Sequence, residues 1–189
     1  MSMEEVVNTN YFGPRRVNDA FGKLLQRPGG RVVNIASASG PNFVSSLPVG
    51  NALTEKLTKP WLIEGGIAEL DSIAKSIKGG DAYGASKALV NAYTVLYAKT
   101  NKDLIINSVT PGWIVSDMTQ GLGASSPPSK GAVPPCWLMM DDELKTNPTG
   151  RYYGSDCVRS PLHFYRGPGE KPYLNDDDLV ELPDSAFAK

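Results

Sequence analysis

The chain has 189 residues, of which 41% are hydrophobic, and its formal net charge is −1. This length suits one well-cored domain, and a charge so near zero gives no electrostatic reason to expect nucleic acid or an anionic membrane as a partner. No apolar run approaches the roughly 20 residues needed to span a bilayer. The two cysteines lack a C-x-x-C spacing, which excludes that kind of metal or redox site. They indicate a reducing compartment, and we expect the cytoplasm.

The first predicted elements are a helix and a strand. Residues 3–25 carry apolar side chains at a period close to 3.6, which predicts a helix. The Pro-Gly-Gly at 28–30 ends this helix. The following run RVVNIASA, at 31–38, is apolar and rich in β-branched residues, which is typical of a buried strand.

A long polar stretch, 41–80, comes before the next regular elements. We expect one helix within it, with Thr54 as the N-cap. Pro60 must kink or divide this helix, and the glycines at 65–66 weaken it further. The stretch therefore predicts a helical excursion from the main alternation of strands and helices.

The remaining elements follow in quick succession. Asp81 caps a strong helix over about 82–99. DLIINSVT, at 103–110, is a second run of the buried-strand type. A short helix at 131–140 and a last strand within 149–156 complete the series.

This alternation is that of an α/β fold with an open parallel sheet. Right-handed crossovers place helices on both faces of such a sheet. Ligands bind beyond the carboxyl ends of its strands. We therefore expect a site at the residues that directly follow 31–35 and 105–109.

Polar groups occur at these positions. Ser37 ends the first strand and Pro111 ends the second, while Tyr83 and Lys87 lie one turn apart on the capped helix. Tyrosine is a poor base at neutral pH, but a nearby cation favours its phenolate form. Ser37 can donate a hydrogen bond to a substrate oxygen or to that phenolate. The combination suits proton transfer to a carbonyl oxygen while hydride arrives from a nicotinamide.

The residues beside this pair are small, namely Gly84, Ala85 and Ala88. We interpret them as leaving room for a flat ring to lie against the helix.

Pro14 adds a feature to the first helix. It has no N–H, so the carbonyl of Asn10, four residues earlier, keeps a free acceptor in mid-helix. A water held there can pass protons toward Lys87. The same proline is also compatible with an ordinary helix kink.

Five motifs occur in fixed order along the chain: TNYFG, GRVVNIASASG, YGASKALVNAY, INSVTPGWIVSDM and GRYYGSD. In that order, from residue 9 to about residue 156, they resemble the landmarks of the short-chain dehydrogenase/reductase family. The resemblance implies a partial Rossmann-like, doubly wound parallel sheet that lacks the first βα units. It also implies an oxidoreductase that transfers hydride between NAD(P)H and a small carbonyl or alcohol substrate.

The resemblance further implies a catalytic tetrad of Asn10, Ser37, Tyr83 and Lys87. In the family the tyrosine is the acid/base, and the lysine holds the cofactor ribose and favours the phenolate. The serine orients the carbonyl, and the asparagine anchors a relay water. Ser37 matches the family position better than Ser39 does.

Cofactor contacts are also implied by the resemblance. The segment after the second strand matches the one that meets the nicotinamide, with serine at 116 where the family usually has threonine. NADP(H) is favoured over NAD(H). The expected cofactor-binding residues are Tyr83, Lys87, Pro111, Gly112, Ile114 and Ser116.

Tyr83 follows Ser37 by 46 residues, a longer spacing than the family usually has. This resembles the carbonyl-reductase-like members, whose inserted helices cover the surface that others use to dimerise. The resemblance therefore implies a monomer for the complete enzyme. The apolar side chains expected to face inward from the insertion are Leu57, Trp61, Leu62, Ile63, Leu70 and Ile73.

No glycine-rich fingerprint follows a strand anywhere in the sequence. We expect a truncated reductase domain at 1–160, with 41–80 inserted, and a partly ordered tail at 161–189, whose acidic end packs poorly. The alternative is a non-catalytic remnant, or a half-fold that binds a partner and cannot hold the cofactor. His163, the single histidine, has no second ligand nearby, so we expect no metal site.

Overall fold

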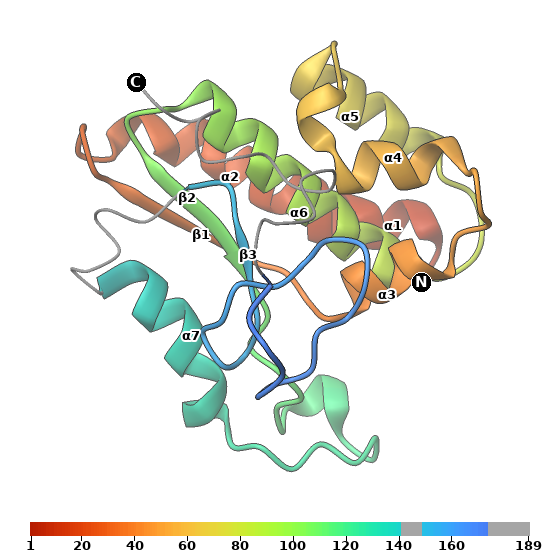
Figure 1. Cartoon of the computed structure of the whole chain (residues 1–189), viewed down its shortest axis with the longest axis vertical. Helices are drawn as coiled ribbons and strands as arrows, with labels where there is room; N and C mark the ends of the chain where they lie inside the picture. The colour runs from red at the N-terminus through yellow and green to blue at the C-terminus, as the bar shows by residue number, and fades with distance from the viewer. Residues whose placement is uncertain (141–148, 174–189) are drawn as a thin grey trace.

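A sheet of three parallel strands forms the centre of the molecule (Figure 1), in a computed structural model that describes residues 1–140 and 149–173. Ile35 and Val109 are register partners at the ends of the first two strands, so these carboxyl ends meet at one end of the sheet. The predicted strand positions and the α/β fold class are confirmed. In the order in which they pair, the strands are β1 (Arg31–Ile35), β2 (Ile105–Val109) and β3 (Tyr152–Tyr153).

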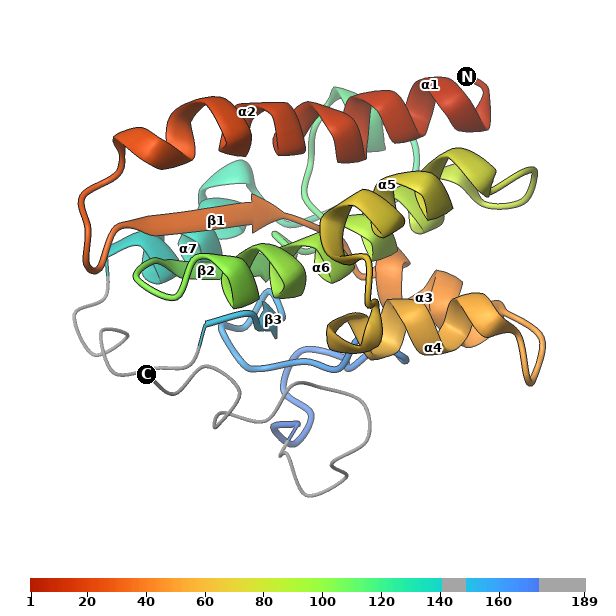
Figure 2. The same cartoon turned by 90° about the horizontal axis from the view of Figure 1, so that it is seen from above.

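Helices cover both faces of the sheet (Figures 1 and 2). One layer holds α6 (Ala82–Thr100) together with the N-terminal helices, and α7 (Pro128–Met140) lies on the other face. Ile106 packs on the α6 side, whereas Val109 packs with Leu138 of α7. The sheet is therefore doubly wound, as predicted.

The N-terminal helix contains a π turn. In this turn the Gly13 N–H donates to the carbonyl of Asn8, five residues back. The wider turn coincides with Pro14, which has no N–H for the carbonyl of Asn10. The parts of this helix, which match the predicted 3–25, are α1 (Met3–Val7), η1 (Asn8–Phe12), α2 (Gly13–Phe21) and η2 (Gly22–Leu24).

The stretch 41–80 differs from the single helix that we expected. The cap is Asn51 and not Thr54, because Asn51 Oδ1 accepts the Leu53 N–H at 2.9 Å and starts the helix three residues earlier. Pro60 divides the stretch, as predicted. The elements are α3 (Ser39–Ser46), α4 (Ala52–Thr58), η3 (Pro60–Leu62) and α5 (Gly66–Ser76).

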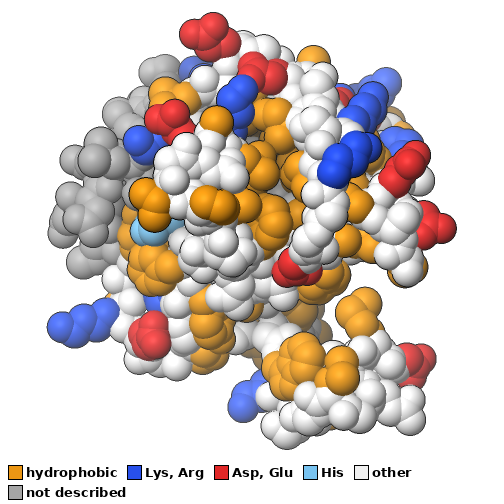
Figure 3. Space-filling view, turned by 90° about the vertical axis from the view of Figure 1, so that its right-hand side faces the viewer, with side chains coloured by type: hydrophobic (Ala, Val, Ile, Leu, Met, Phe, Trp, Pro, Cys, Tyr) orange, Lys and Arg blue, Asp and Glu red, His pale blue; other side chains and the backbone are white. Residues whose placement is uncertain are grey.

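These helices cover α6 on the side of the molecule seen in Figure 3. Leu57, Ile63 and Leu70 are buried in the cluster that includes α6 residues, as expected. Leu62 is 54% exposed, so its predicted inward orientation is wrong. It lies at the end of the short η3 turn, on the side away from the core cluster.

The α6 helix begins at its predicted cap. Asp81 Oδ1 accepts the Gly84 N–H at 2.9 Å and so closes the first turn. From Gly84 to Ala98 every residue except Lys87 is buried. The helix is central to the fold, and its first turn is fixed against the carboxyl ends of the strands.

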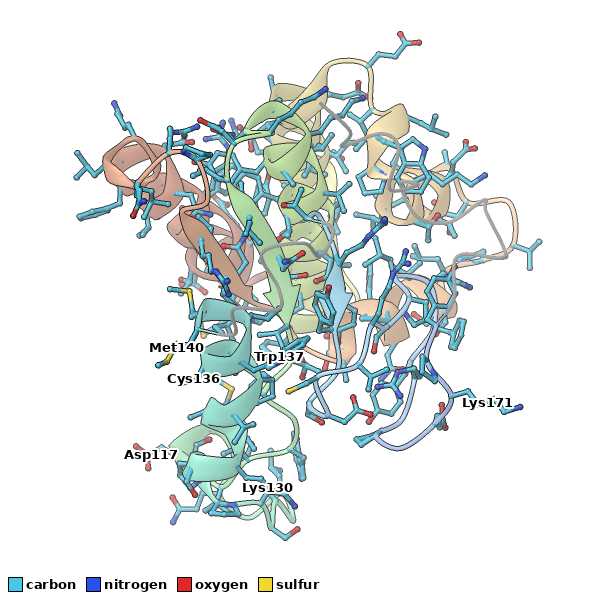
Figure 4. The ribbon with its side chains drawn as sticks, turned by 60° about the vertical axis from the view of Figure 1, so that its left-hand side comes forward. Asp117, Lys130, Cys136, Trp137, Met140 and Lys171 are labelled. Carbon is cyan, nitrogen blue, oxygen red and sulfur yellow. The ribbon has the colours of Figure 1, made fainter. Side chains whose placement is uncertain are left out.

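The α7 helix starts at Pro128, three residues earlier than predicted. Trp137 lies on its sheet-facing side, where its ring meets Tyr153 edge to face with centroids 5.4 Å apart, while Met140 lies on the other side (Figure 4). Beyond β3, Arg166 is buried and pairs with Asp156. The tail from residue 174, expected to pack poorly, lies outside the described residues.

Within residues 1–140 and 149–173, no helix combines the length and the apolar character that crossing a membrane requires.

Candidate active site

The carboxyl ends of β1 and β2 bring two predicted positions together. The Ala36 N–H donates to the carbonyl of Val109 at 2.8 Å, which extends the strand pairing by one residue. Ser37 follows directly on one strand, and Thr110 and Pro111 follow on the other. The site therefore begins where the open-sheet topology predicts it.

Lys87 joins the α6 helix to the end of β1. Its Nζ donates to the Ile35 carbonyl at 2.9 Å and lies 5.6 Å from the centroid of the Tyr83 ring. Burial lowers the pKa of the Lys87 ammonium below its ordinary value, because removal from water disfavours the charged form. The structure thus places a partly desolvated cation beside the tyrosine.

Tyr83 lies in the first turn of α6 and is half-buried. Among the described residues, none forms a hydrogen bond with its phenol oxygen. That oxygen is available to a ligand at the end of the sheet.

Asn10 reaches the same turn through Ser86. Asn10 Nδ2 donates to Ser86 Oγ at 3.1 Å, and Ser86 Oγ donates to the Tyr83 carbonyl at 2.7 Å. Ser86 is fully buried between the two helices. We did not predict this role for Ser86, although its position three residues after Tyr83 on a helix places it one turn away.

Ser37 forms the turn that leads into α3. Its Oγ accepts the Ser39 N–H at 3.2 Å, and its carbonyl accepts the Gly40 N–H at 3.0 Å. The hydroxyl proton donates to no group among the described residues, so the side chain keeps a donor for a ligand. No hydrogen bond joins Ser37 to Tyr83 in this part of the chain.

The small residues of α6 pack against α3, so our interpretation of them as room for a ring is wrong. Ala85 and Ala88 are buried in the core. A Cβ on Gly84 would lie 2.9 Å from Cβ of Phe43, and one on Gly40 would lie 3.0 Å from the Ala88 nitrogen. Close contact between α3 and α6 is what brings the Ser37 turn near Lys87.

The segment after β2 makes a tight turn at the strand ends and then runs toward α7. Gly112 has a φ of +87°, and its N–H donates to Thr110 Oγ1 at 3.2 Å, which makes a tight turn beside the strand ends. Ile114 bridges to Ser126 and lies against α7, since a Cβ on Gly131 would be 2.6 Å from Ile114 Cγ1.

Ser116 lies further out. Its N–H donates to Thr119 Oγ1 at 2.9 Å, which caps η4 (Asp117–Thr119). Asp117 lies in the loop that projects away from the strands (Figure 4). Within the described residues, no hydrogen bond connects any of Pro111, Gly112, Ile114 and Ser116 to Tyr83 or Lys87. Pro111 and Gly112 lie within three residues of the end of β2, whereas Ile114 and Ser116 follow the loop away from the strands.

The chain is similar in sequence to named dehydrogenases and reductases. No family model matches the chain. The chain is 29% identical over 170 residues to (+)-neomenthol dehydrogenase of Arabidopsis thaliana, covering 82% of this chain and 55% of the relative. It is 30% identical over 168 residues to (−)-isopiperitenone reductase of Mentha piperita, covering 81% and 51%. Carbonyl reductase (NADPH) 1 of Bos taurus is 27% identical over 171 residues, covering 82% and 60%.

A solved structure agrees with these relatives. The structure of salutaridine reductase from Papaver somniferum superposes with a TM-score of 0.67 over 80% of this chain and 54% of that chain, at 24% identity, which shows the same fold. The chain is a homologue of the short-chain dehydrogenases/reductases. The predicted resemblance is confirmed, and the names of the relatives, which are dehydrogenases and reductases, support the expected resemblance to an oxidoreductase. The chain spans about half the length of these short-chain dehydrogenase/reductase relatives.

Proposed function

We propose that this chain carries the proton-transfer site of a nicotinamide-dependent oxidoreductase for carbonyl or alcohol substrates. The observation that supports this most is the pairing of Tyr83 with the Lys87 ammonium, 5.6 Å from the ring, at the carboxyl ends of β1 and β2. In reduction, the Tyr83 phenol donates its proton to the substrate oxygen, and in oxidation the phenolate accepts it. Lys87 favours that phenolate by its charge.

The other two members of the tetrad act on the substrate and on the proton path. Ser37 offers its hydroxyl proton to the carbonyl oxygen of the substrate and so orients it toward Tyr83. Asn10 is fixed to the same turn through Ser86, and its backbone carbonyl, which Pro14 cannot satisfy, is the acceptor for a water on the path toward Lys87.

The residues at the strand ends fit the nicotinamide end of a cofactor. Gly112 makes a tight turn beside the strand ends, and the Lys87 ammonium, held at the end of β1 by the Ile35 carbonyl, is the group that we assign to the ribose. A nicotinamide, when bound, supplies or accepts the hydride. We assign Pro111, Gly112, Ile114 and Ser116 to this contact.

NADP(H) is the cofactor that we favour. Relatives of this chain include carbonyl reductases named for NADPH, from Bos taurus and Rattus norvegicus. The sequence has no glycine-rich fingerprint after a strand, so we assign only the nicotinamide end of the cofactor to these residues.

The remaining features of the proposal concern the whole protein. We propose that residues 1–160 act as the reductase domain of a cytoplasmic enzyme. We also propose that this enzyme is a monomer, because the helices of 41–80 cover α6 and leave it no face for pairing with a second copy. One observation favours the alternative of a partner-binding half-fold: among the described strands, β1 pairs on one side only.

The decisive test is Tyr83→Phe, assayed by NADPH oxidation with a carbonyl substrate. We expect kcat to fall by about 10²-fold or more, with cofactor affinity nearly unchanged. Tyr97→Phe, near the other end of the same helix, is the matched control and should retain activity. A Tyr83→Phe variant that keeps most of its kcat would refute the acid/base assignment. A preparation that never turns over, while binding a partner chain, would favour the half-fold.

A further inference from the structure

A groove of about 670 Å³ lies between the N-terminal helices and the end of α5, and neither Tyr83 nor Ser37 lines it. Apolar side chains from both sides form its floor. The N-terminal helices contribute Met3, Val7 and Phe12, and the end of α5 contributes Ala74 and Ile77. Figure 3 shows this side of the molecule, where hydrophobic side chains lie between Lys and Arg side chains. The groove is within the size range of small-molecule sites.

Three cations line the groove without a carboxylate partner among the described residues. Arg16 contacts only the neutral side chain and carbonyl of Asn8, at 3.2 and 3.4 Å. Lys75 Nζ lies 5.8 Å from the Phe12 ring centroid. Lys78 forms no hydrogen bond or ion pair with another described residue, and Glu4 is the one acid in the lining. The charge of the lining is therefore net positive.

We propose that this groove binds an aliphatic carboxylate of medium chain length. The apolar floor accommodates an alkyl chain, which gains free energy for each methylene removed from water. The carboxylate lies at the positive rim, where the planar Arg16 guanidinium can form two parallel hydrogen bonds and the two lysines add charge. A phosphate or a sugar would leave the floor uncovered. The proposal does not depend on the oxidoreductase activity.

Calorimetric titration of the 189-residue chain with octanoate, decanoate and dodecanoate tests the proposal. We expect affinity to rise about threefold to fourfold per methylene, and 1-dodecanol to bind at least tenfold more weakly than dodecanoate. Lys78→Gln and Arg16→Gln should each weaken dodecanoate binding several-fold. Lys102→Gln, an exposed lysine at the end of α6, is the control and should have no effect.

Methionine methyl NMR locates the ligand independently of the variants. Met3 lines the groove, whereas Met118, Met139 and Met140 are exposed elsewhere. We expect the Met3 methyl signal to shift on saturation with dodecanoate while these three remain unchanged, and Tyr83→Phe to bind equally well. Shifts confined to Met139 and Met140, equal binding of the alcohol, or no saturable binding would overturn the proposal. Circular dichroism confirms that each variant is folded.

Discussion

At Lys87, a backbone hydrogen bond and burial act on the same ammonium. The Ile35 carbonyl fixes the position of Nζ, and desolvation makes its charge costly. In the proposed mechanism, Lys87→Met removes both the cation that favours the phenolate and the group that holds the cofactor ribose. We expect kcat/KM to fall by about 10²-fold or more and the KM for NADPH to rise. The free energy of unfolding should change by no more than about 1 kcal/mol, since the lost hydrogen bond and the relieved desolvation oppose each other. Unaltered turnover in Lys87→Met would remove the lysine from the mechanism.

The pH dependence of turnover follows from the same residue. Because the pKa of Lys87 is lowered by burial, its positive charge is lost at a lower pH than that of an ordinary lysine. We expect kcat/KM for reduction to decline on the alkaline side as that charge disappears. In Lys87→Arg the guanidinium stays charged throughout, so the part of the decline that comes from residue 87 should be absent and the alkaline limb should be displaced. Identical alkaline limbs in the two proteins would show that another group titrates.

At the scale of elements, the contact between α3 and α6 positions the site. A Cβ on Gly40 would lie 3.0 Å from both the Lys87 carbonyl carbon and the Ala88 nitrogen, and backbone cannot move aside as a side chain can. We expect Gly40→Ala to destabilise the fold by about 1–3 kcal/mol and to lower kcat by moving the Ser37 turn. Thermal denaturation and the NADPH assay measure the two effects.

Gly13→Ala is the matched control for Gly40→Ala. Its Cβ would meet only the Asn8 carbonyl oxygen, at 3.8 Å, and its φ of −59° suits alanine. Alanine is favoured over glycine in a helix by about 1 kcal/mol, so this variant should be at least as stable as the original chain. Equal stability losses in both variants would show that close packing at Gly40 is not the cause.

The same elements show how far the sequence predicts the structure. The strands, the Asp81 cap and the Tyr83–Lys87 turn depend on local patterns, and local patterns identified them. Helix α3 spans eight residues, which is too short for an apolar period to identify it, and its buried Phe43 and Val44 belong to the cluster that includes α6 residues. A small residue such as Gly84 can leave space for a ligand or allow another helix to pack closely. The sequence does not show which, because that depends on the element packed against it, here α3. Ser86 was missed for the same reason: its partner, Asn10, lies 76 residues away.

At the scale of the whole molecule, the edge of β1 that does not face β2 is the surface most prone to association with other chains. Parallel sheets are normally covered on both faces, and their edge strands are usually protected. Among the described strands, β1 has β2 as its single neighbour. Ile35 is 45% exposed at its end, and Phe21 and Leu24 are exposed on the helix beside it. An apolar strand edge of this kind associates with other chains.

We therefore expect the 189-residue chain by itself to associate in a concentration-dependent way through β1. Ile35→Lys places a charge on this edge, and edge lysines oppose strand pairing, so the variant should shift the sedimentation profile toward the monomer. Val49→Lys, at a fully exposed position in the loop between α3 and α4, adds the same charge away from the strand and should leave association unchanged. If both variants remain as associated as the original chain, or if the original chain is monomeric at high concentration, the β1 edge is not an association surface. A monomeric original chain would mean that the helices α4 and α5, which cover α6 on a different face, are enough to prevent self-association.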